Sequence, residues 1–141
     1  MRTISKRRKQ VSRGDVMLES ALIFIVFFCM LLGTFDFGQF LYIHQALVER
    51  ARWAAREGVA GQYTSDQTRN LVLYGTTTAG TTGYFDLDTT MVTVTTFNAG
   101  TDSARLEVKL FNYPYKMLSP YLAGTYSGPN ILIEIPEGFY N

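Results

Sequence analysis

Few residues of this chain have types and spacings suited to catalysis or metal binding. It contains one histidine and one cysteine. Its two close carboxylate pairs, Asp86 with Asp88 and Glu134 with Glu137, have no nucleophile, base or further ligand beside them in sequence. A catalytic site needs groups in complementary roles, and a calcium site needs six or more oxygen ligands. We therefore expect no enzymatic activity, no metal and no cofactor.

The carboxylate of Glu19 is more informative, because it lies inside an apolar segment. Residues 16–35 contain no other charged side chain and have the length needed to span a bilayer. A lone carboxylate in such a segment costs about 3 kcal/mol on insertion scales. Either Glu19 lies near the cytoplasmic interface and reaches Arg13 or lipid headgroups, or it pairs with a group of another molecule.

The charge distribution orients this segment in the membrane. Six Lys and Arg residues give the first fourteen residues a charge of +6, which leaves −5 for the rest of the chain. Basic residues beside an apolar span stay in the cytoplasm, so residues beyond about 36 are expected outside it. Because the apolar run follows the basic cluster directly, we expect a membrane role rather than nucleic-acid binding. Residues 33–37 lack the small-residue site of a cleaved secretory signal.

The spacing of Gly14, Asp15 and Glu19 resembles a type IV prepilin processing site. In that family a membrane-embedded aspartyl peptidase cuts after the glycine on the cytoplasmic face, which implies removal of residues 1–14 and a new N-terminus at Asp15. Glycine keeps the scissile peptide accessible, and Glu19 lies one helical turn from the new amine, where it would pair with a neighbouring subunit's amine and set the axial register. Asp15 departs from the small or apolar residue usual after the glycine and would partly neutralise its own amine.

Helical spacing continues beyond the apolar segment. Apolar residues recur every three or four positions, and no proline occurs before residue 114. We expect one helix from about Val16 to Glu57, about 60 Å long at 1.5 Å per residue, with half of it projecting outward. Gly58 is the expected helix stop.

The sequence of this helix resembles that of the TadE/TadG-like pseudopilins. Members of that family combine a basic leader, the Gly-Glu spacing, an Asp-Phe-Gly motif and an Ala-Ala-Arg-Glu-Gly segment. The motif residues here are Asp36, Phe37, Gly38, Arg56, Glu57 and Gly58. The resemblance implies a minor pilin or pseudopilin of a Flp-type (Tad) type IV pilus in the bacterial inner membrane. Its implied partners are the prepilin peptidase, other pilin or pseudopilin subunits in a homo- or hetero-oligomer, and the inner-membrane assembly platform. Its implied roles are pilus assembly, surface adhesion or secretion.

Two polar residues of the helix have alternative interpretations. Asp36 is either the first polar residue at the outer interface or the partner of an arginine on a neighbouring subunit or assembly protein. His44 lies on a helix face with Leu41 and Leu47, where we expect it to be packed or at an interface rather than to act as a ligand.

Residues 59–141 are expected to form an extracytoplasmic head. Thr64 or Ser65 should begin a short helix that ends at Gly75. Alternating residues in 91–97, 104–111 and 131–136 predict three antiparallel strands packed on the helix, with Asn98–Asp102 as a hairpin turn. Arg105, Glu107 and Lys109 should face solvent.

The sequence therefore predicts a pilin-like α+β fold. Its expected parts are a leader (1–14), a transmembrane half-helix (15–35), an outward half-helix (36–58) and the head (59–141). The tyrosines of the head, Tyr113, Tyr115, Tyr121 and Tyr126, either cover a small core or form a partner surface. The alternative function is an uncleaved single-span membrane protein whose head binds a ligand or glycan.

Overall fold

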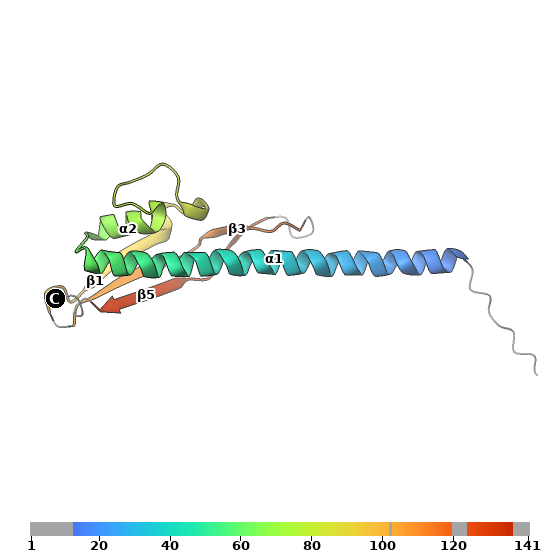
Figure 1. The fold of residues 1–141 in the computed structure, drawn as a ribbon, viewed down its shortest axis with the longest axis horizontal. Helices are drawn as coiled ribbons and strands as arrows, with labels where there is room; N and C mark the ends of the chain where they lie inside the picture. Colours follow the sequence, from blue (N-terminus) through green and yellow to red (C-terminus); the bar gives the residue numbers. More distant parts are fainter. Residues whose placement is uncertain (1–12, 102, 120–123, 137–141) are drawn as a thin grey trace, which may run out of the picture.

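The computed structural model describes residues 13–101, 103–119 and 124–136. The basic leader up to residue 12 lies outside the described residues, as do Asp102, Tyr121 and Glu137. One long helix carries all the other elements on its C-terminal half (Figure 1). In chain order the elements are α1 (Arg13–Ala60), α2 (Ser65–Tyr74), the short 3-10 helices η1 (Tyr84–Asp86) and η2 (Thr89–Met91), β1 (Val92–Phe97), β2 (Arg105–Leu110), β3 (Pro114–Lys116), β4 (Thr125–Ser127) and β5 (Ile131–Pro136).

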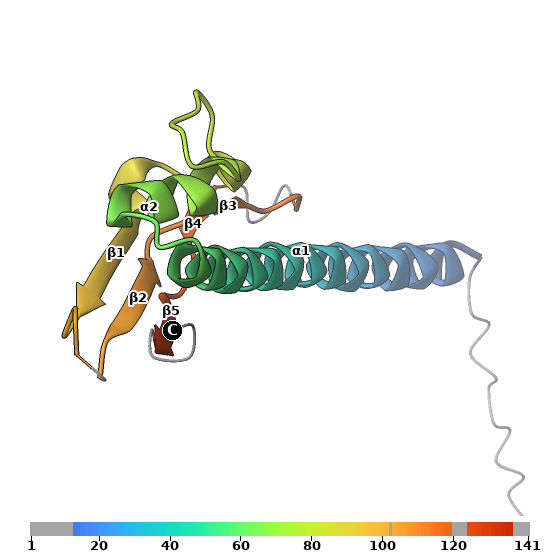
Figure 2. The same cartoon turned by 60° about the vertical axis from the view of Figure 1, so that its left-hand side comes forward.

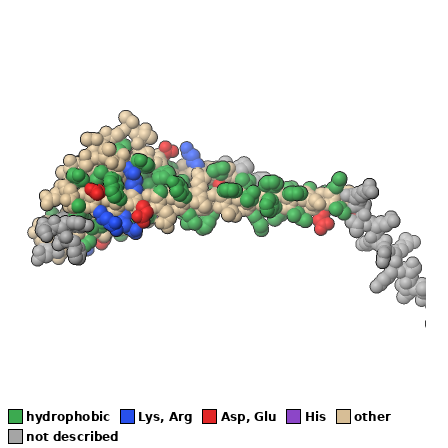
Figure 3. Space-filling model, in the orientation of Figure 1, with side chains coloured by type: hydrophobic (Ala, Val, Ile, Leu, Met, Phe, Trp, Pro, Cys, Tyr) green, Lys and Arg blue, Asp and Glu red, His purple; other side chains and the backbone are tan. Residues whose placement is uncertain are grey.

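The two halves of α1 have different surroundings. From Val16 to Phe35 its large apolar side chains are mostly exposed, and this is the one helix in the described residues that is long and apolar enough to cross a membrane. In the second half Leu47, Ala51 and Ala54 are fully buried under the head. Figure 3 shows hydrophobic side chains along the uncovered half.

The helix ends three residues later than the predicted last residue, Glu57. Gly58 was expected to stop it, but α1 continues to Ala60. Gly58 is a packing position instead: a Cβ there would lie 2.6 Å from Thr68 Oγ1 and 2.8 Å from Thr68 Cγ2. The missing side chain thus lets α1 and α2 approach closely, and the helix continues through the residue.

Both ends of α2 follow the sequence prediction. The Thr64 hydroxyl accepts a hydrogen bond from the Gln67 N–H, and the Gln67 side chain accepts one from the Thr64 N–H, which forms a capping box. Gly75 ends the helix in the left-handed conformation, with φ of 77°.

The three predicted strands form one antiparallel sheet with the order β1-β2-β5. Its inner face packs on both helices, with α2 over β1 and α1 over β2 and β5 (Figure 2). Glu107 is a correction: it lies on the outer face of β2, as expected, yet it is only 8% exposed. The neighbouring strands flank it on both sides, and its carboxylate accepts a hydrogen bond from Lys109 Nζ at 3.0 Å.

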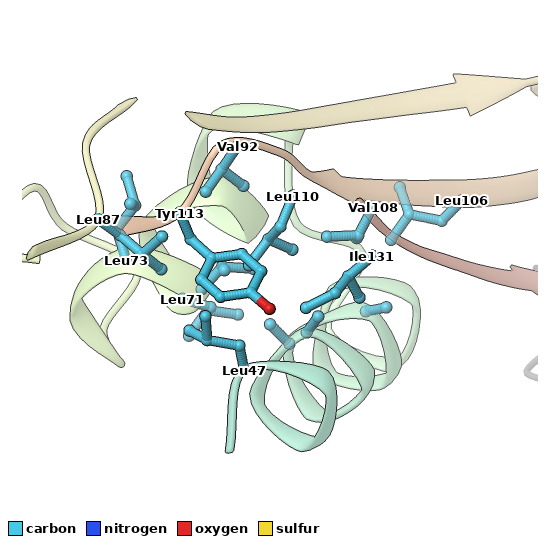
Figure 4. Packing of buried hydrophobic residues seen from close by; sticks show 14 of the residues in the cluster. Leu47, Leu71, Leu73, Leu87, Val92, Leu106, Val108, Leu110, Tyr113 and Ile131 are labelled. Atoms are coloured by element: carbon cyan, nitrogen blue, oxygen red, sulfur yellow. The ribbon is translucent and has the colours of Figure 1, made fainter. Parts of the chain in front are cut away.

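A second, two-stranded sheet was not predicted. β3 and β4 pair antiparallel and extend from the main sheet along α1 toward its apolar half (Figures 1 and 2). We call the described residues of this feature, 112–119 and 124–128, the arm. Tyr113 begins the arm inside the core, among Leu47, Leu73 and Leu110 (Figure 4).

Candidate functional site

The residues of the predicted processing site lie in the first turns of α1. Arg13 is the first residue of α1 that the structure describes, and Gly14 and Asp15 follow it, so their peptide bond is part of the helix. Asp15 and Glu19 are four residues apart and therefore share one face of the helix. Both are exposed, and no hydrogen bond to the Glu19 carboxylate occurs within the described part of the chain. A glycine weakens the helix at this turn, because it lowers helix propensity.

The structure does not bring the predicted site residues together. At 1.5 Å per residue, Glu19 and Asp36 are about 26 Å apart along α1, and Asp36 and Arg56 about 30 Å. Phe37, Gly38, Arg56 and Glu57 are exposed on the helix surface, and a Cβ on Gly38 would have no atom within 4 Å. These residues therefore lie at three separate levels of one helix: its first turns, the junction with the head at Asp36, and the end of α1 beneath α2.

Asp36 has a role that neither interpretation of the sequence included. It is 4% exposed, and its carboxylate accepts hydrogen bonds from two backbone groups of the arm. The Leu118 N–H donates to Oδ1 at 2.6 Å, and the Ser119 N–H donates to Oδ1 at 3.1 Å and to Oδ2 at 3.2 Å. Hydrogen bonds to a charged acceptor are stronger than neutral ones, so Asp36 fastens the end of the arm to α1.

An aromatic series continues this junction toward the core. Phe40 and His44 follow Asp36 at intervals of four, so all three lie on the helix face beneath the arm. The ring of Phe40 lies 4.9 Å from that of Tyr115, between centroids. His44 Nδ1 lies 2.7 Å from the hydroxyl of the fully buried Tyr113. His44 is thus packed within its own subunit, which confirms the first of its two expected environments.

The head tyrosines divide between the two interpretations. Tyr113 is completely buried and covers the core, because Gly128 leaves room for its ring: a Cβ there would lie 1.9 Å from Tyr113 Cζ. Tyr115 stacks on Tyr126, with 5.6 Å between ring centroids. Tyr126 is still 38% exposed, so it alone of the three described residues leaves a large surface uncovered.

Arg50 joins three elements and was not singled out from the sequence. Its Nε donates to the Val72 carbonyl near the C-terminus of α2 at 2.6 Å, and its guanidinium lies 3.6 Å above the Tyr84 ring of η1. Burial lowers the pKa of Arg50 from its ordinary value, and Tyr84 opposes this effect. A cation at a helix C-terminus is favourable, so Arg50 stabilises the packing of α2 on α1.

Two signals in the sequence pointed to this junction. The spacing of Asp36, Phe40 and His44 places a carboxylate, a ring and an imidazole on one helix face, and several tyrosines and prolines occur after β2. The sequence did not show that these two segments, more than sixty residues apart, contact each other. Among the residues that the structure describes, no group of three or more His, Cys, Asp or Glu side chains is placed to hold a metal ion.

The fold and the site define a class: one long helix whose N-terminal half is a candidate membrane span, with a small α+β head on its C-terminal half. Within that class, residues 14–56 match the family model described as TadE-like protein, which confirms the resemblance found in the sequence. Neither the curated proteins nor the solved structures compared with this chain gave a match. The match lies on α1, whose apolar half is the candidate membrane span.

Proposed function

We propose that this protein is a minor pilin or pseudopilin of a Flp-type (Tad) type IV pilus. Residues 1–14 are its leader, removed by the prepilin peptidase, and residues 15–35 hold it in the bacterial inner membrane with the N-terminus in the cytoplasm. Residues 36–58 continue the spine outward, and the remainder forms the extracytoplasmic head. Its role is structural, through contacts with other subunits and the assembly platform, and involves no catalysis.

The observation that carries the proposal is the isolated Glu19 carboxylate. It is exposed on a half-helix that the protein's own head leaves uncovered, and its own described residues offer it no hydrogen bond. A carboxylate in lipid costs about 3 kcal/mol, so an opposite charge at the same depth is strongly favoured. The new α-amine of a processed neighbour, one turn from its own Glu19, supplies that charge.

The outer half of α1 supports subunit contact as well. Large side chains remain exposed on it at Phe37, Leu41, Tyr42 and Trp53. Aromatic residues of this kind are enriched in protein interfaces. The head buries only one side of the helix, which leaves this surface available to neighbouring subunits.

Intact mass of the membrane-extracted protein tests the processing step. A chain that begins at Asp15 supports the proposal, whereas a chain that still carries its leader supports the alternative, an uncleaved single-span protein with a ligand- or glycan-binding head. The Gly14→Lys variant should keep its leader, because a long charged side chain blocks access to the scissile bond. Normal maturation of that variant would contradict cleavage at this site.

Cell fractionation separates the finer roles. A filament subunit should be recovered with pili sheared from the cell surface, and an assembly factor should remain in the inner-membrane fraction. Deletion of the protein followed by assays of surface attachment and of secretion then separates adhesion from secretion.

A further inference from the structure

The surface of α1 stays compatible with lipid beyond the segment that the sequence marks as apolar. Between Glu19 and Glu49, the only carboxylate on the helix is Asp36, which is buried, and no charged side chain is exposed. The Ser20 and Thr34 hydroxyls donate to carbonyls one turn earlier, Val16 and Met30, so they do not need water either.

Asp36 ends the apolar run in the sequence but not on the surface. Its carboxylate receives its hydrogen bonds from the arm, so it needs no water at this level. The exposed residues that follow are Phe37, Gly38, Leu41 and Tyr42, and the first exposed amide is Gln45. Tyrosine is enriched at membrane–water interfaces. Residues 20–41 span about 33 Å, close to the hydrocarbon thickness of about 30 Å.

These lengths place the end of the arm inside the membrane boundary. If the outer boundary lies near Tyr42, Asp36 is about 9 Å deeper along the helix. The Leu118 N–H is bonded to Asp36, so the end of the arm is fixed at that depth. The Leu118 side chain is 69% exposed, although it is large and apolar.

We infer that the end of the arm is a lipid-binding element, in which Leu118 enters the outer boundary of the bilayer beside α1. The occupant of this surface is lipid because the surface is continuous with the membrane span and is held at its depth. Lys116, two residues earlier on β3, has a side chain that is 71% exposed and would lie nearer the phosphates, where its Nζ is also 3.9 Å from Oδ2 of the exposed Asp86. A cation above an inserted apolar residue is the usual order at an interface.

Depth-dependent fluorescence quenching tests this contact in the full-length protein. The native cysteine is first replaced (Cys29→Ser), and an environment-sensitive fluorophore is attached at Leu118→Cys, whose exposed side chain makes disturbance of the fold small. The protein is placed in phosphatidylethanolamine–phosphatidylglycerol vesicles, with and without lipids that carry a nitroxide near the headgroup. The label at Leu118→Cys should lose most of its emission to the nitroxide lipid.

Two control positions make the result decisive. Leu132→Cys, on the outer face of the main sheet, is 52% exposed and should keep its emission. Phe24→Cys, about 6 Å from the start of the span at residue 20, should be quenched by the same nitroxide lipid. If Phe24→Cys is quenched while Leu118→Cys behaves like Leu132→Cys, the arm does not bind lipid and the inference is wrong. If Phe24→Cys also escapes quenching, the membrane span itself is wrong, and the inference fails with it.

Discussion

Asp36 shows how one side chain can hold two distant segments together. It accepts hydrogen bonds from residues 82 and 83 positions later in the chain. A buried carboxylate without hydrogen-bond partners costs free energy, because it has lost its contact with water. The backbone donors of the arm replace that contact, so the carboxylate and the arm stabilise each other. The Asp-Phe-Gly motif thus has an intramolecular function in addition to any contact with a neighbour.

The Asp36→Ala variant should release the end of the arm. It leaves two backbone N–H groups without an acceptor and should destabilise the docked arm by about 2–3 kcal/mol. Hydrogen exchange of the Leu118 and Ser119 amides, in detergent or vesicles, should become much faster while exchange in β2 is unchanged. Asp36→Asn keeps one oxygen acceptor, so the docked arm should be destabilised less than in Asp36→Ala. Equal protection in Asp36→Ala and the wild type would contradict the fastening role.

Tyr113 makes the head sensitive to alkaline pH. Burial raises the pKa of its hydroxyl above the ordinary value of 10.0, and Tyr115 acts in the same direction. The folded state therefore favours the neutral hydroxyl. Its contribution to stability is complete below the pKa of the unfolded chain, about 10, and is lost as pH rises through the higher pKa of the folded state.

Replacement of Tyr113 by phenylalanine separates these effects. Tyr113→Phe should lower the free energy of unfolding at neutral pH by about 1 kcal/mol, because His44 Nδ1 loses its partner. The same variant should unfold at a higher alkaline pH, since no phenolate forms in the core. A denaturant series at neutral pH measures the first effect, and circular dichroism across an alkaline series measures the second. Tyr42→Phe, at a residue that is 68% exposed, should change neither; a shared alkaline midpoint for all three proteins would contradict the assignment.

At the scale of elements, Gly58 lets α1 pack closely against α2. Gly58→Ala should separate α1 from α2, because the new methyl would overlap the fully buried Thr68 side chain. The expected loss is about 1–3 kcal/mol, as for other overpacked sites. Thermal unfolding and exchange of the α2 amides measure it. Gly38→Ala is a matched control on the same helix, and with open space around it should be neutral or stabilising by up to about 1 kcal/mol. A similar change in the free energy of unfolding for the two variants would contradict the packing role of Gly58.

Elements with a strong local signal could be predicted, and those defined by partners could not. The capping residues fixed both ends of α2, and alternation in six-residue segments identified β1, β2 and β5. β3 and β4 have three residues each, too few to show a period, and they form because they pair with each other. Gly58 was taken as a stop because a glycine in sequence does not reveal whether a neighbouring helix needs its missing side chain. The processing residues remain a prediction.

For the whole molecule, the proposed assembly depends on Glu19. Glu19→Gln should be inserted and processed normally, since the apolar span and Gly14 are intact, but it should assemble poorly. Loss of one partner from a buried charge pair costs about 3–5 kcal/mol, or more than about a hundredfold in association. Quantitative blotting of sheared pili against the membrane fraction measures the effect. Glu19→Asp retains the charge and should assemble better; equal recovery of all three proteins would contradict the pairing.

The uninterrupted course of α1 has a mechanical consequence. No break occurs between the apolar half of the helix and the head, and the arm adds a second attachment at Asp36, so span and head turn together. The 48 residues of α1 make a lever about 72 Å long. A change of tilt of about 20°, which is ordinary for a membrane helix, displaces its outer end by about 25 Å. In the proposed membrane orientation, a small change in the tilt of the span thus becomes a large movement of the head.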